Sequence, residues 1–395
     1  RGRRRFSAGG LAAAAERGPV EEETMNFLYY WRRIDGTLFL TILSLAALGI
    51  LIIGSATHVN DVDYAGRFDF VVRQGTFFLL GFAVSAFFMR YDYRLLYRWA
   101  PALYVVNCLM LLFVRVAGTS ALGAQRWIQI GPVSIQPSEF AKVLMIICLA
   151  RMLADHKGGF RTWRSLLPVA GLMLPPFILV FIQPDLGTSL VFAAICFGML
   201  FLSGLRMRIV KQALCALVAF FPVLWFFLLH DYQKTRILVL FDPDVDPFGS
   251  GYHVIQSKIS IGSGGFIGQG LFEGTQSQLN FLPENHTDFI FSVIGEELGF
   301  VGAIFLLFLY FLLLYRTIVV SRSAGDAFGS LLACGIFSMW LFQVFINVGM
   351  TLGIMPVTGI PLPFISYGGS ALMVNMICAG ILMNIYLRRK KLMFN

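Results

Sequence analysis

The chain has 395 residues, of which 57% are hydrophobic and only 13% are charged. This composition excludes a soluble globular domain, because apolar runs of about 20 residues are long enough to cross the hydrocarbon core of a bilayer as helices. The net charge of +9 does not indicate a nucleic-acid-binding protein, since the basic residues lie in short loops between apolar runs, where they follow the positive-inside bias of membrane proteins.

Residues 1–24 differ from the rest of the chain. RGRRRFSAGG is basic and LAAAAERGPVEEET is rich in Ala and Glu. Neither segment contains the apolar core of a signal peptide, and Met25 opens the next segment, MNFLYYWRR. We therefore predict that 1–24 is a disordered extension or a remnant of an expression vector, followed by one membrane domain over 25–395.

About ten apolar segments follow. Their hydrophobicity is continuous rather than alternating, which predicts helices and not the strands of a barrel. The predicted fold is therefore an all-α polytopic membrane protein with a large extracytoplasmic loop, 230–286, between the seventh and eighth spans. The predicted spans are 36–56, 71–89, 99–117, 138–154, 166–182, 187–204, 210–229, 287–314, 328–349 and 367–387.

Every second loop between these spans is basic. The basic clusters precede the first span and follow the second, fourth, sixth, eighth and tenth spans. By the positive-inside rule, these loops and both termini are predicted to be cytoplasmic. The polar and Gly-rich loops then face outward, and they are 57–70, 118–137, 183–186, 230–286 and 350–366. The chain has no Walker A motif and no dinucleotide-binding fingerprint, which argues further against a cytosolic nucleotide as the substrate.

The first outward loop with an informative pattern is AQRWIQIGPVSIQPSEFAK (124–142). Arg126 lies in the loop, and Glu139 and Lys142 are three residues apart at the start of a span, so they share one helix face. One interpretation is a Glu–Lys pair that satisfies itself. The other is a polar, cationic wall for a phosphate-bearing ligand. The short turn in QPDLGTSLVF (183–192) adds Asp185 to the same side of the membrane.

The large outward loop contains FDPDVDPFGSGYHVIQS (241–257), in which Asp242, Asp244 and Asp246 crowd together. Two interpretations are open. The three residues can form an acidic turn bounded by Pro and Gly, which is solvated or binds a cation. Alternatively, one carboxylate is a general base in a pocket at the membrane surface. Composition alone favours the turn.

The segment LPENHTDFIFSVIGEELG (282–299) places Asp288, Glu296 and Glu297 at or inside the start of a predicted span. Placing a carboxylate inside a membrane costs free energy, so such residues are usually functional or ion-paired. The sequence leaves both roles open. Because Glu296 and Glu297 are adjacent, they cannot face the same way on a helix.

The Pro and Gly residues of PVTGIPLPFISYGGS (356–370) prevent a regular helix, so this segment is expected to be buried in protein or to line a cavity. The charged groups of the outward loops thus converge on one membrane surface. They would fit a lipid-linked substrate that carries a pyrophosphate and sugars. An ion-coupled transporter would fit almost as well.

Five of these motifs, in this order, resemble the SEDS family of shape, elongation, division and sporulation proteins. The resemblance covers essentially 26–391, and the fourth motif looks more like the rod-shape-determining branch of the family than like the division branch. The motifs are RWIQIGPVSIQPSEFAK, QPDLGT, DPFGSGYHVIQSKISIGSGG, GTQSQLNFLPENHTDFIFSVIGEELG and PLPFISYGGS.

The resemblance implies a peptidoglycan glycosyltransferase that polymerises lipid II. The 4-hydroxyl of the acceptor sugar would attack C1 of the donor MurNAc and displace undecaprenyl pyrophosphate. This reaction needs a base for the hydroxyl and cationic groups for the leaving pyrophosphate. The resemblance places the essential Asp of the family in the DPFG segment, which makes Asp246 the predicted catalytic residue.

The resemblance also implies substrate-binding roles for other charged residues. Glu139 and Lys142 match family positions that line the central cavity, and Arg126 matches another polar site. Lys258 is a candidate ligand of the pyrophosphate, and two carboxylates of the 282–299 segment are expected to shape the cavity or to pair with cations. The complete predicted set is Arg126, Glu139, Lys142, Lys258, Asp288 and Glu297.

No cofactor or metal ligand is identified by the sequence, although a divalent cation (Mg²⁺ or Mn²⁺) bridging the pyrophosphate oxygens is chemically reasonable. The resemblance implies a partner, a class B penicillin-binding protein that acts as a transpeptidase in the bacterial inner membrane. Two alternatives to the polymerase are a lipid II flippase and a non-catalytic scaffold for the transpeptidase. A flippase needs polar groups through the full membrane depth, whereas the polar motifs here are concentrated on the outer side.

Overall fold

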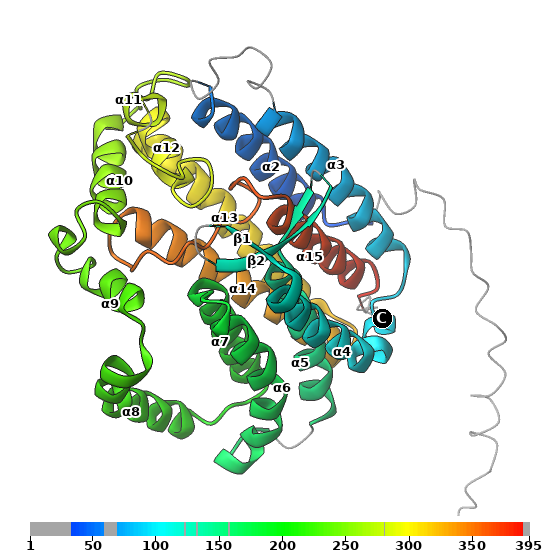
Figure 1. Cartoon of the computed structure of the whole chain (residues 1–395). Helices are drawn as coiled ribbons and strands as arrows, with labels where there is room; N and C mark the ends of the chain where they lie inside the picture. Colours follow the sequence, from blue (N-terminus) through cyan, green and yellow to red (C-terminus); the bar gives the residue numbers. More distant parts are fainter. Residues whose placement is uncertain are drawn as a thin grey trace, which may run out of the picture. The chain divides into compact units, whose positions relative to one another are not determined.

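Long apolar helices follow one another along most of the chain (Figure 1). The computed structural model describes residues 33–58, 69–121, 124–131, 133–156, 159–279 and 281–389. The predicted extension 1–24 lies outside these described residues. Residues Asp35–Asn395 group into one unit, and the account below concerns its described part.

Within the described part, ten helices correspond to the ten predicted spans. Eight of them are long and apolar enough to cross a membrane. The other two are α5, which carries several charged residues, and α7, which is shorter. The chain is therefore a multi-pass membrane protein. The ten helices are α2 (Gly36–Ala56), α3 (Asp69–Arg90), α4 (Arg94–Ala117), α5 (Pro137–Asp155), α6 (Trp163–Ile182), α7 (Leu186–Leu202), α8 (Met207–Val223), α13 (Gly299–Ser323), α14 (Ala327–Thr351) and α15 (Gly369–Leu387).

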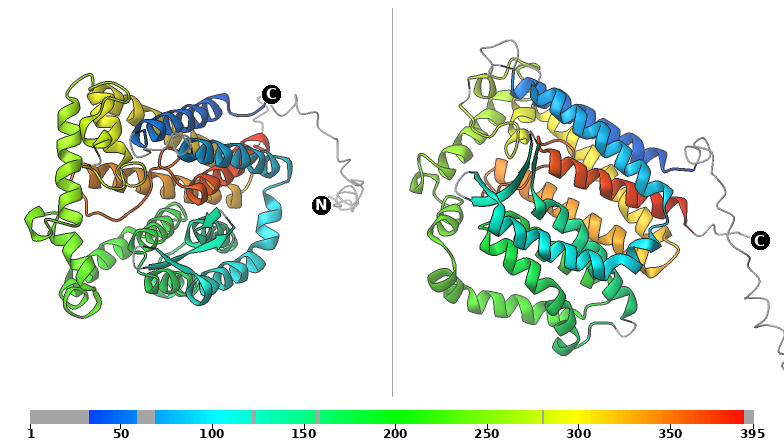
Figure 2. Two further views of the ribbon diagram at one scale, coloured as in Figure 1. Left: turned by 45° about the horizontal axis from the view of Figure 1, so that its top comes forward. Right: turned by 45° about the vertical axis from the view of Figure 1, so that its right-hand side comes forward.

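Helices α14 and α15 form the buried centre of the bundle, whereas α8 is almost entirely exposed at its margin (Figures 1 and 2). Small residues allow the central helices to approach closely, as is usual in membranes. A Cβ on Gly380 of α15 would lie 2.7 Å from the Ser85 carbonyl oxygen of α3. One pair of polar groups in this centre is formed by the indole of Trp340, which donates to Asn375 Oδ1 at 2.8 Å.

The predicted span 287–314 is wrong at its start, because a short helix and a break precede the span. Helix α12 (Ile290–Glu297) ends at Leu298, and α13 begins at Gly299 with a positive φ of +65°. The loop at 265–270 interlocks with this break. Gln269 N–H donates to the Glu296 carbonyl at 3.0 Å, and Phe300 N–H donates to the Gly265 carbonyl at 3.0 Å. A Cβ on Gly299 would lie 2.3 Å from Gly268 N, so both the backbone conformation and the close packing require glycine there.

The segment predicted as the loop 230–286 is largely helical. The chain runs from α8 through its π-helical end η2 (Leu224–Leu228) into α9 (Asp231–Leu238), then through η3 (Pro243–Val245), α10 (Ser250–Gly264) and α11 (Thr275–Gln278) to α12 (Figure 1). Helix α10 packs against α12. A buried apolar cluster attaches the segment to the bundle, and it consists of Val239, Val254, Leu282, Phe289, Met350 and Val357.

Between α4 and α5 the chain forms a small antiparallel sheet that the all-α prediction missed. Its strands are β1 (Thr119–Ala121), β2 (Ala124–Ile130) and β3 (Val133–Ile135), in the order β1-β2-β3. In the second hairpin, Ile128 pairs with Ile135. The sheet is too short to form a separate domain, but it positions Arg126.

The segment after α14 is non-helical and buried, as its Pro and Gly content predicted. Leu362, Phe364 and Ile365 are all at most 2% exposed. Surrounding helices satisfy its backbone, since Tyr310 Oη donates to the Pro363 carbonyl at 2.7 Å. Irregular backbone at this depth is tolerated because protein groups replace the missing water.

Candidate active site

Arg126 is held over the turn between α6 and α7. Its Nε donates to the Gln183 carbonyl at 3.1 Å, and its terminal nitrogen donates to the Pro184 carbonyl. The Gln183 side chain in turn donates to the Leu111 carbonyl of α4 at 2.9 Å. The guanidinium is therefore fixed by neutral carbonyl groups, and its positive charge is available to a ligand.

Asp185 caps the N-terminus of α7 directly beside this turn. Its carboxylate accepts from Thr188 N at 3.1 Å and from the Thr188 hydroxyl at 2.9 Å. Ser138 Oγ, at the start of α5, donates to it at 3.2 Å. Side-chain capping of this kind satisfies backbone N–H groups that a helix start leaves free. Asp185 thus joins α5 to α7, and it adds a buried negative charge beside the turn that holds Arg126.

A second cation, Arg236, comes from α9. Its guanidinium lies over the ring of Tyr232, 5.9 Å from the centroid, and the Tyr232 hydroxyl donates to the Pro184 carbonyl at 3.5 Å. Burial lowers the pKa of Arg236, opposed by Tyr232, Asp288 and Asp185. Arg236 makes no salt bridge with any residue that the structure describes.

Asp288 lies among these groups. Loss of solvation by burial, reinforced by Glu284, raises the pKa of Asp288 from 3.8 to about 6, while Arg236 and Arg126 oppose the shift. The backbone of Asp288 is anchored to α14, since Asn347 Nδ2 donates to its carbonyl at 2.9 Å. A carboxylate with this pKa is largely ionised at neutral pH and still basic enough to accept a proton.

Gly359 provides the space for this carboxylate. It has a φ of +71°, and a Cβ there would lie 3.2 Å from Asp288 Oδ2. The buried loop after α14 therefore forms one side of the Asp288 environment. The unpaired Asn347 Oδ1 and Thr358 Oγ1 add polar atoms to the same region.

Asp246, the predicted catalytic residue, binds Ser250, the first residue of α10. Its Oδ2 accepts from Ser250 N at 2.7 Å and from Ser250 Oγ at 2.9 Å. Asp242 plays a similar local part, because it accepts from Asp244 N at 3.1 Å. These contacts match the turn interpretation of the DPDVDPFG segment, and a catalytic role of Asp246 stays a prediction.

Glu139 and Lys142 form a buried ion pair within α5. Lys142 Nζ lies 2.7 Å from Glu139 Oε1, and the two side chains are only 6% and 2% exposed. The structure thus shows the self-satisfied pair that the spacing allowed. Neither side chain presents an open surface to a substrate, and their predicted role in binding is not supported by this burial.

Glu296 and Glu297 point to different partners, as their adjacency predicted. Glu296 accepts from Gln276 N at 2.6 Å and from Ser260 Oγ at 2.9 Å, so it holds the start of α11 against α10. Glu297 accepts from the Ser55 hydroxyl of α2, and burial raises the pKa of Glu297 to about 7. The sequence allowed ion pairs with Arg or Lys here. The structure shows hydroxyl and backbone partners instead. Glu296 connects α12 to α10 and α11, and Glu297 connects α12 to α2.

Glu297 and Lys258 lie apart from the arginine pair. Glu297 is the last residue of α12, about 10 Å of helix from Ile290 at its start, and it is therefore distant from Asp288, which precedes the helix. Lys258 is exposed on α10, and its side chain covers Gly353, where a Cβ would lie 2.2 Å from Lys258 Cε. Of the predicted set, the structure brings Arg126 and Asp288 together.

Sequence reasoning missed Arg236 as a site residue and left Asp185 outside the predicted set. A weak signal existed for Arg236, since HDYQKTRIL is a charged segment directly after a span. For a metal ion, no group of three or more His, Cys, Asp or Glu side chains converges in the described ranges.

Comparisons with known proteins agree on one family. A family model described as cell cycle protein, FtsW/RodA/SpoVE, matches residues 36–391. The peptidoglycan glycosyltransferase MrdB of Escherichia coli is 43% identical over 92% of this chain and 96% of its own length. The stage V sporulation protein E of Bacillus subtilis is 38% identical over 89% of this chain and 96% of its own length.

Solved structures show the same architecture. A chain from a study of how a peptidoglycan synthase complex coordinates polymerisation and crosslinking aligns with a TM-score of 0.78 at 33% identity, covering 90% of this chain and 98% of that one. The rod shape determining protein RodA of Thermus thermophilus aligns with a TM-score of 0.67 at 31% identity, covering 91% and 99%.

Proposed function

Because this chain belongs to the FtsW/RodA/SpoVE family, it is a peptidoglycan glycosyltransferase, and we propose that it polymerises lipid II at the site formed by Asp288, Arg126 and Arg236. The observation that carries this assignment is a desolvated carboxylate next to two arginines, neither of which forms a salt bridge with a carboxylate in the described part of the chain. A base and cations for a leaving pyrophosphate are the two requirements of the reaction.

The proposed reaction forms one glycosidic bond and breaks one phosphate ester bond at the same carbon. Asp288 accepts the proton of the acceptor 4-hydroxyl as the oxygen attacks C1 of the donor sugar. The C1–O bond to the pyrophosphate breaks, and the leaving group departs as undecaprenyl pyrophosphate. Arg126 and Arg236 stabilise the negative charge that develops on it, because guanidinium groups bind phosphate oxygens with charge-assisted hydrogen bonds.

Asp288 is preferred over Asp246 as the base for a physical reason. The Asp246 carboxylate already accepts two hydrogen bonds from Ser250, so part of its capacity to accept a hydrogen bond from a substrate hydroxyl is occupied. Burial acts in the opposite direction on Asp288 and raises its pKa.

The site is proposed to lie on the extracytoplasmic side of the bacterial inner membrane, with both termini cytoplasmic. The distribution of basic loops supports this orientation. The proposed partner is a class B penicillin-binding protein that crosslinks the new glycan, in line with the synthase complex in which a structural neighbour was studied.

Glycan polymerisation from labelled lipid II tests the proposal. The protein is purified with its transpeptidase, and wild type is compared with Asp288→Asn and Asp246→Asn. Wild type should form polymer. Asp288→Asn should lose about 100-fold or more of the rate, as is typical when a general base is removed. Asp246→Asn should stay close to wild type, because the amide oxygen of Asn can still accept a hydrogen bond from Ser250 N.

The reverse pattern, an inactive Asp246→Asn and an active Asp288→Asn, would make Asp246 the base. Co-purification with the transpeptidase and elution as a monodisperse peak control for folding. A folded wild type that forms no polymer would contradict the proposed activity. A translocation assay of lipid II across liposome membranes would then distinguish a flippase from a scaffold.

A further inference from the structure

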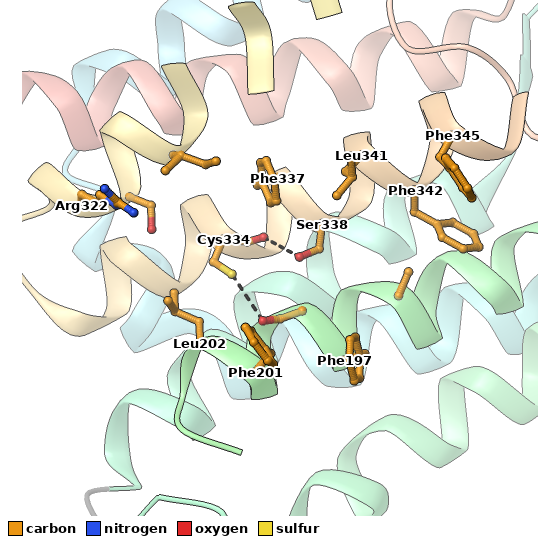
Figure 3. A pocket seen from close by; sticks show the side chains of 14 residues that line it. Phe197, Phe201, Leu202, Arg322, Cys334, Phe337, Ser338, Leu341, Phe342 and Phe345 are labelled. Carbon is orange, nitrogen blue, oxygen red and sulfur yellow. Dashed lines mark hydrogen bonds between the residues drawn. The ribbon is translucent and has the colours of Figure 1, made fainter. Parts of the chain in front are cut away.

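A groove runs along the lipid-facing side of the bundle between α7, the end of α13 and α14, and it encloses about 540 Å³. Figure 3 shows Phe197 and Phe201 of α7 on one wall and Phe337, Leu341 and Phe345 of α14 on the other. Four of these five side chains are each 44% to 57% exposed in the protein alone. Apolar side chains so open to the membrane form a wall that hydrocarbon can contact.

The floor of the groove is a close contact between α7 and α14. A Cβ on Gly198 would lie 1.9 Å from Ser338 Oγ, so only glycine lets the two helices approach this closely. The Cys334 thiol donates to the Gly198 carbonyl at 3.5 Å, and the Ser338 hydroxyl donates to the Cys334 carbonyl at 2.9 Å (Figure 3). The polar groups of the floor are thus satisfied within the protein, and the surface they leave is apolar.

One end of the groove is positively charged. Arg322, in the last turn of α13, lines that end (Figure 3), and it forms no salt bridge within the described ranges. The nearby acid Asp326 is engaged elsewhere, since it pairs with Arg94 at 2.9 Å. Arg206 and Arg208 follow the end of α7, whose last residue borders the same groove.

The charged end lies at the opposite end of the bundle from the candidate active site. Helix α14 begins just after Arg322, whereas Asn347 near its other end binds the backbone of Asp288. The groove is therefore separate from the glycosyltransferase site. Its charged end is on the side that the positive-inside rule assigns to the cytoplasm.

We propose that this groove binds an anionic phospholipid of the cytoplasmic leaflet, with the headgroup phosphate at Arg322 and an acyl chain along the phenylalanine walls. The length of the groove fits one leaflet. From Cys334 to Phe345, α14 rises about 16 Å, and half of the hydrocarbon core is about 15 Å. Basic pockets between membrane helices on this side recognise anionic headgroups.

The charge at Arg322 favours an anionic lipid over a zwitterionic one. Any acyl chain can cover the apolar walls, so the walls alone would not discriminate between lipids. A headgroup with net negative charge gains a charge-assisted contact with the guanidinium. A zwitterionic headgroup carries its own cation close to the phosphate, which reduces this gain.

Photocrosslinking in nanodiscs tests the proposal. The full chain is placed in phosphatidylcholine nanodiscs that contain a small fraction of phosphatidylglycerol with a diazirine in its acyl chain. After illumination, mass spectrometry should find the label in the peptides that contain 197–202 and 337–345. Arg322→Gln should lower this labelling about fivefold, the effect expected for one arginine near an anionic surface.

Two further variants make the test specific. Arg164→Gln removes an exposed arginine at the same end of the bundle but outside the groove, and it should leave the labelling unchanged. Ala194→Phe places a ring in the groove and should lower labelling by both charged and neutral analogues. Monodisperse elution of each variant controls for folding.

Three results would overturn the proposal. Equal labelling by a phosphatidylcholine analogue would show that the groove takes any acyl chain. Unchanged labelling in Arg322→Gln would remove the headgroup contact. Loss of all labelling when the transpeptidase is added, in discs where the free chain was labelled, would show that the groove is a protein interface.

Discussion

Asp288 is the residue at which burial, charge and position coincide. Its pKa is raised to about 6, and a general base works only when it is deprotonated. We therefore expect the polymerisation rate to rise with pH through about 6 and to level off above about 7. The measurement is the pH dependence of kcat/KM with labelled lipid II. An acid limb centred near pH 4 would mean that another, ordinary carboxylate is the base.

The same shift makes a prediction for stability. A carboxyl whose pKa is raised on folding binds more protons in the folded state, so the free energy of unfolding falls as pH rises from about 4 to about 6. Above that range the ionised Asp288 destabilises the fold. Asp288→Asn should therefore raise the melting temperature at pH 7.5, and the difference should vanish below about pH 4. A rise in melting temperature that is the same at all pH values would show that the ionisation of Asp288 is not its cause.

The Glu139–Lys142 pair tests how much free energy of unfolding is lost when a buried charge has no partner. Lys142→Met leaves Glu139 buried without its partner, which typically costs about 3–5 kcal/mol of unfolding free energy. Adding Glu139→Gln should recover most of that loss. The exposed pair of Arg73 and Asp69, 53% and 48% exposed, is the matched control, and Arg73→Gln should cost about 1 kcal/mol or less. Equal losses in the two single variants would mean that burial does not control this energy.

At the scale of elements, carboxylates accept hydrogen bonds at the N-termini of α10 and α11 and stabilise these helix starts. Asp246→Ala removes two hydrogen bonds at the start of α10 and should cost about 1–3 kcal/mol, whereas Asp246→Asn keeps an acceptor and should cost less. The loss should appear first as faster hydrogen exchange in the first turns of α10, measured by mass spectrometry. Exchange that is unchanged in Asp246→Ala would show that Ser250 does not rely on this carboxylate.

The junction of α12 and α13 explains why the eighth span was predicted too early. The segment IFSVIGEELGFVGAIF is apolar across the break, so hydrophobicity alone continues the helix through it. The break exists because Gly268 and Gly299 allow two backbone segments to pack directly on each other, which no local pattern reveals. The same contact places Glu296 and Glu297 at the end of α12, before the span, instead of inside the span.

At the scale of the whole molecule, the predicted orientation can be measured by cysteine labelling. Phe248 is 95% exposed in the outer segment, and Arg161 is exposed in a basic loop. In intact spheroplasts, an impermeant maleimide should label Phe248→Cys and should label Arg161→Cys only after permeabilisation. The unmodified chain, whose described cysteines are free and lie in apolar helices, gives the background. The opposite pattern would invert the topology and place the Asp288 site in the cytoplasm.

The sequence by itself determined the membrane architecture, because crossing a bilayer requires long apolar helices, and each of these can be recognised in the sequence as an apolar segment. It also determined the family through its ordered motifs, whereas the roles of Arg126 and Asp288 as site residues stay a prediction. Only the tertiary structure decided what the individual charges do. It bound Asp246 to the first residue of α10, paired Glu139 with Lys142 inside α5, and brought Arg236 from α9 towards Asp288. Burial and partners set the pKa and the availability of a charged group, and both depend on segments that are far apart in the sequence.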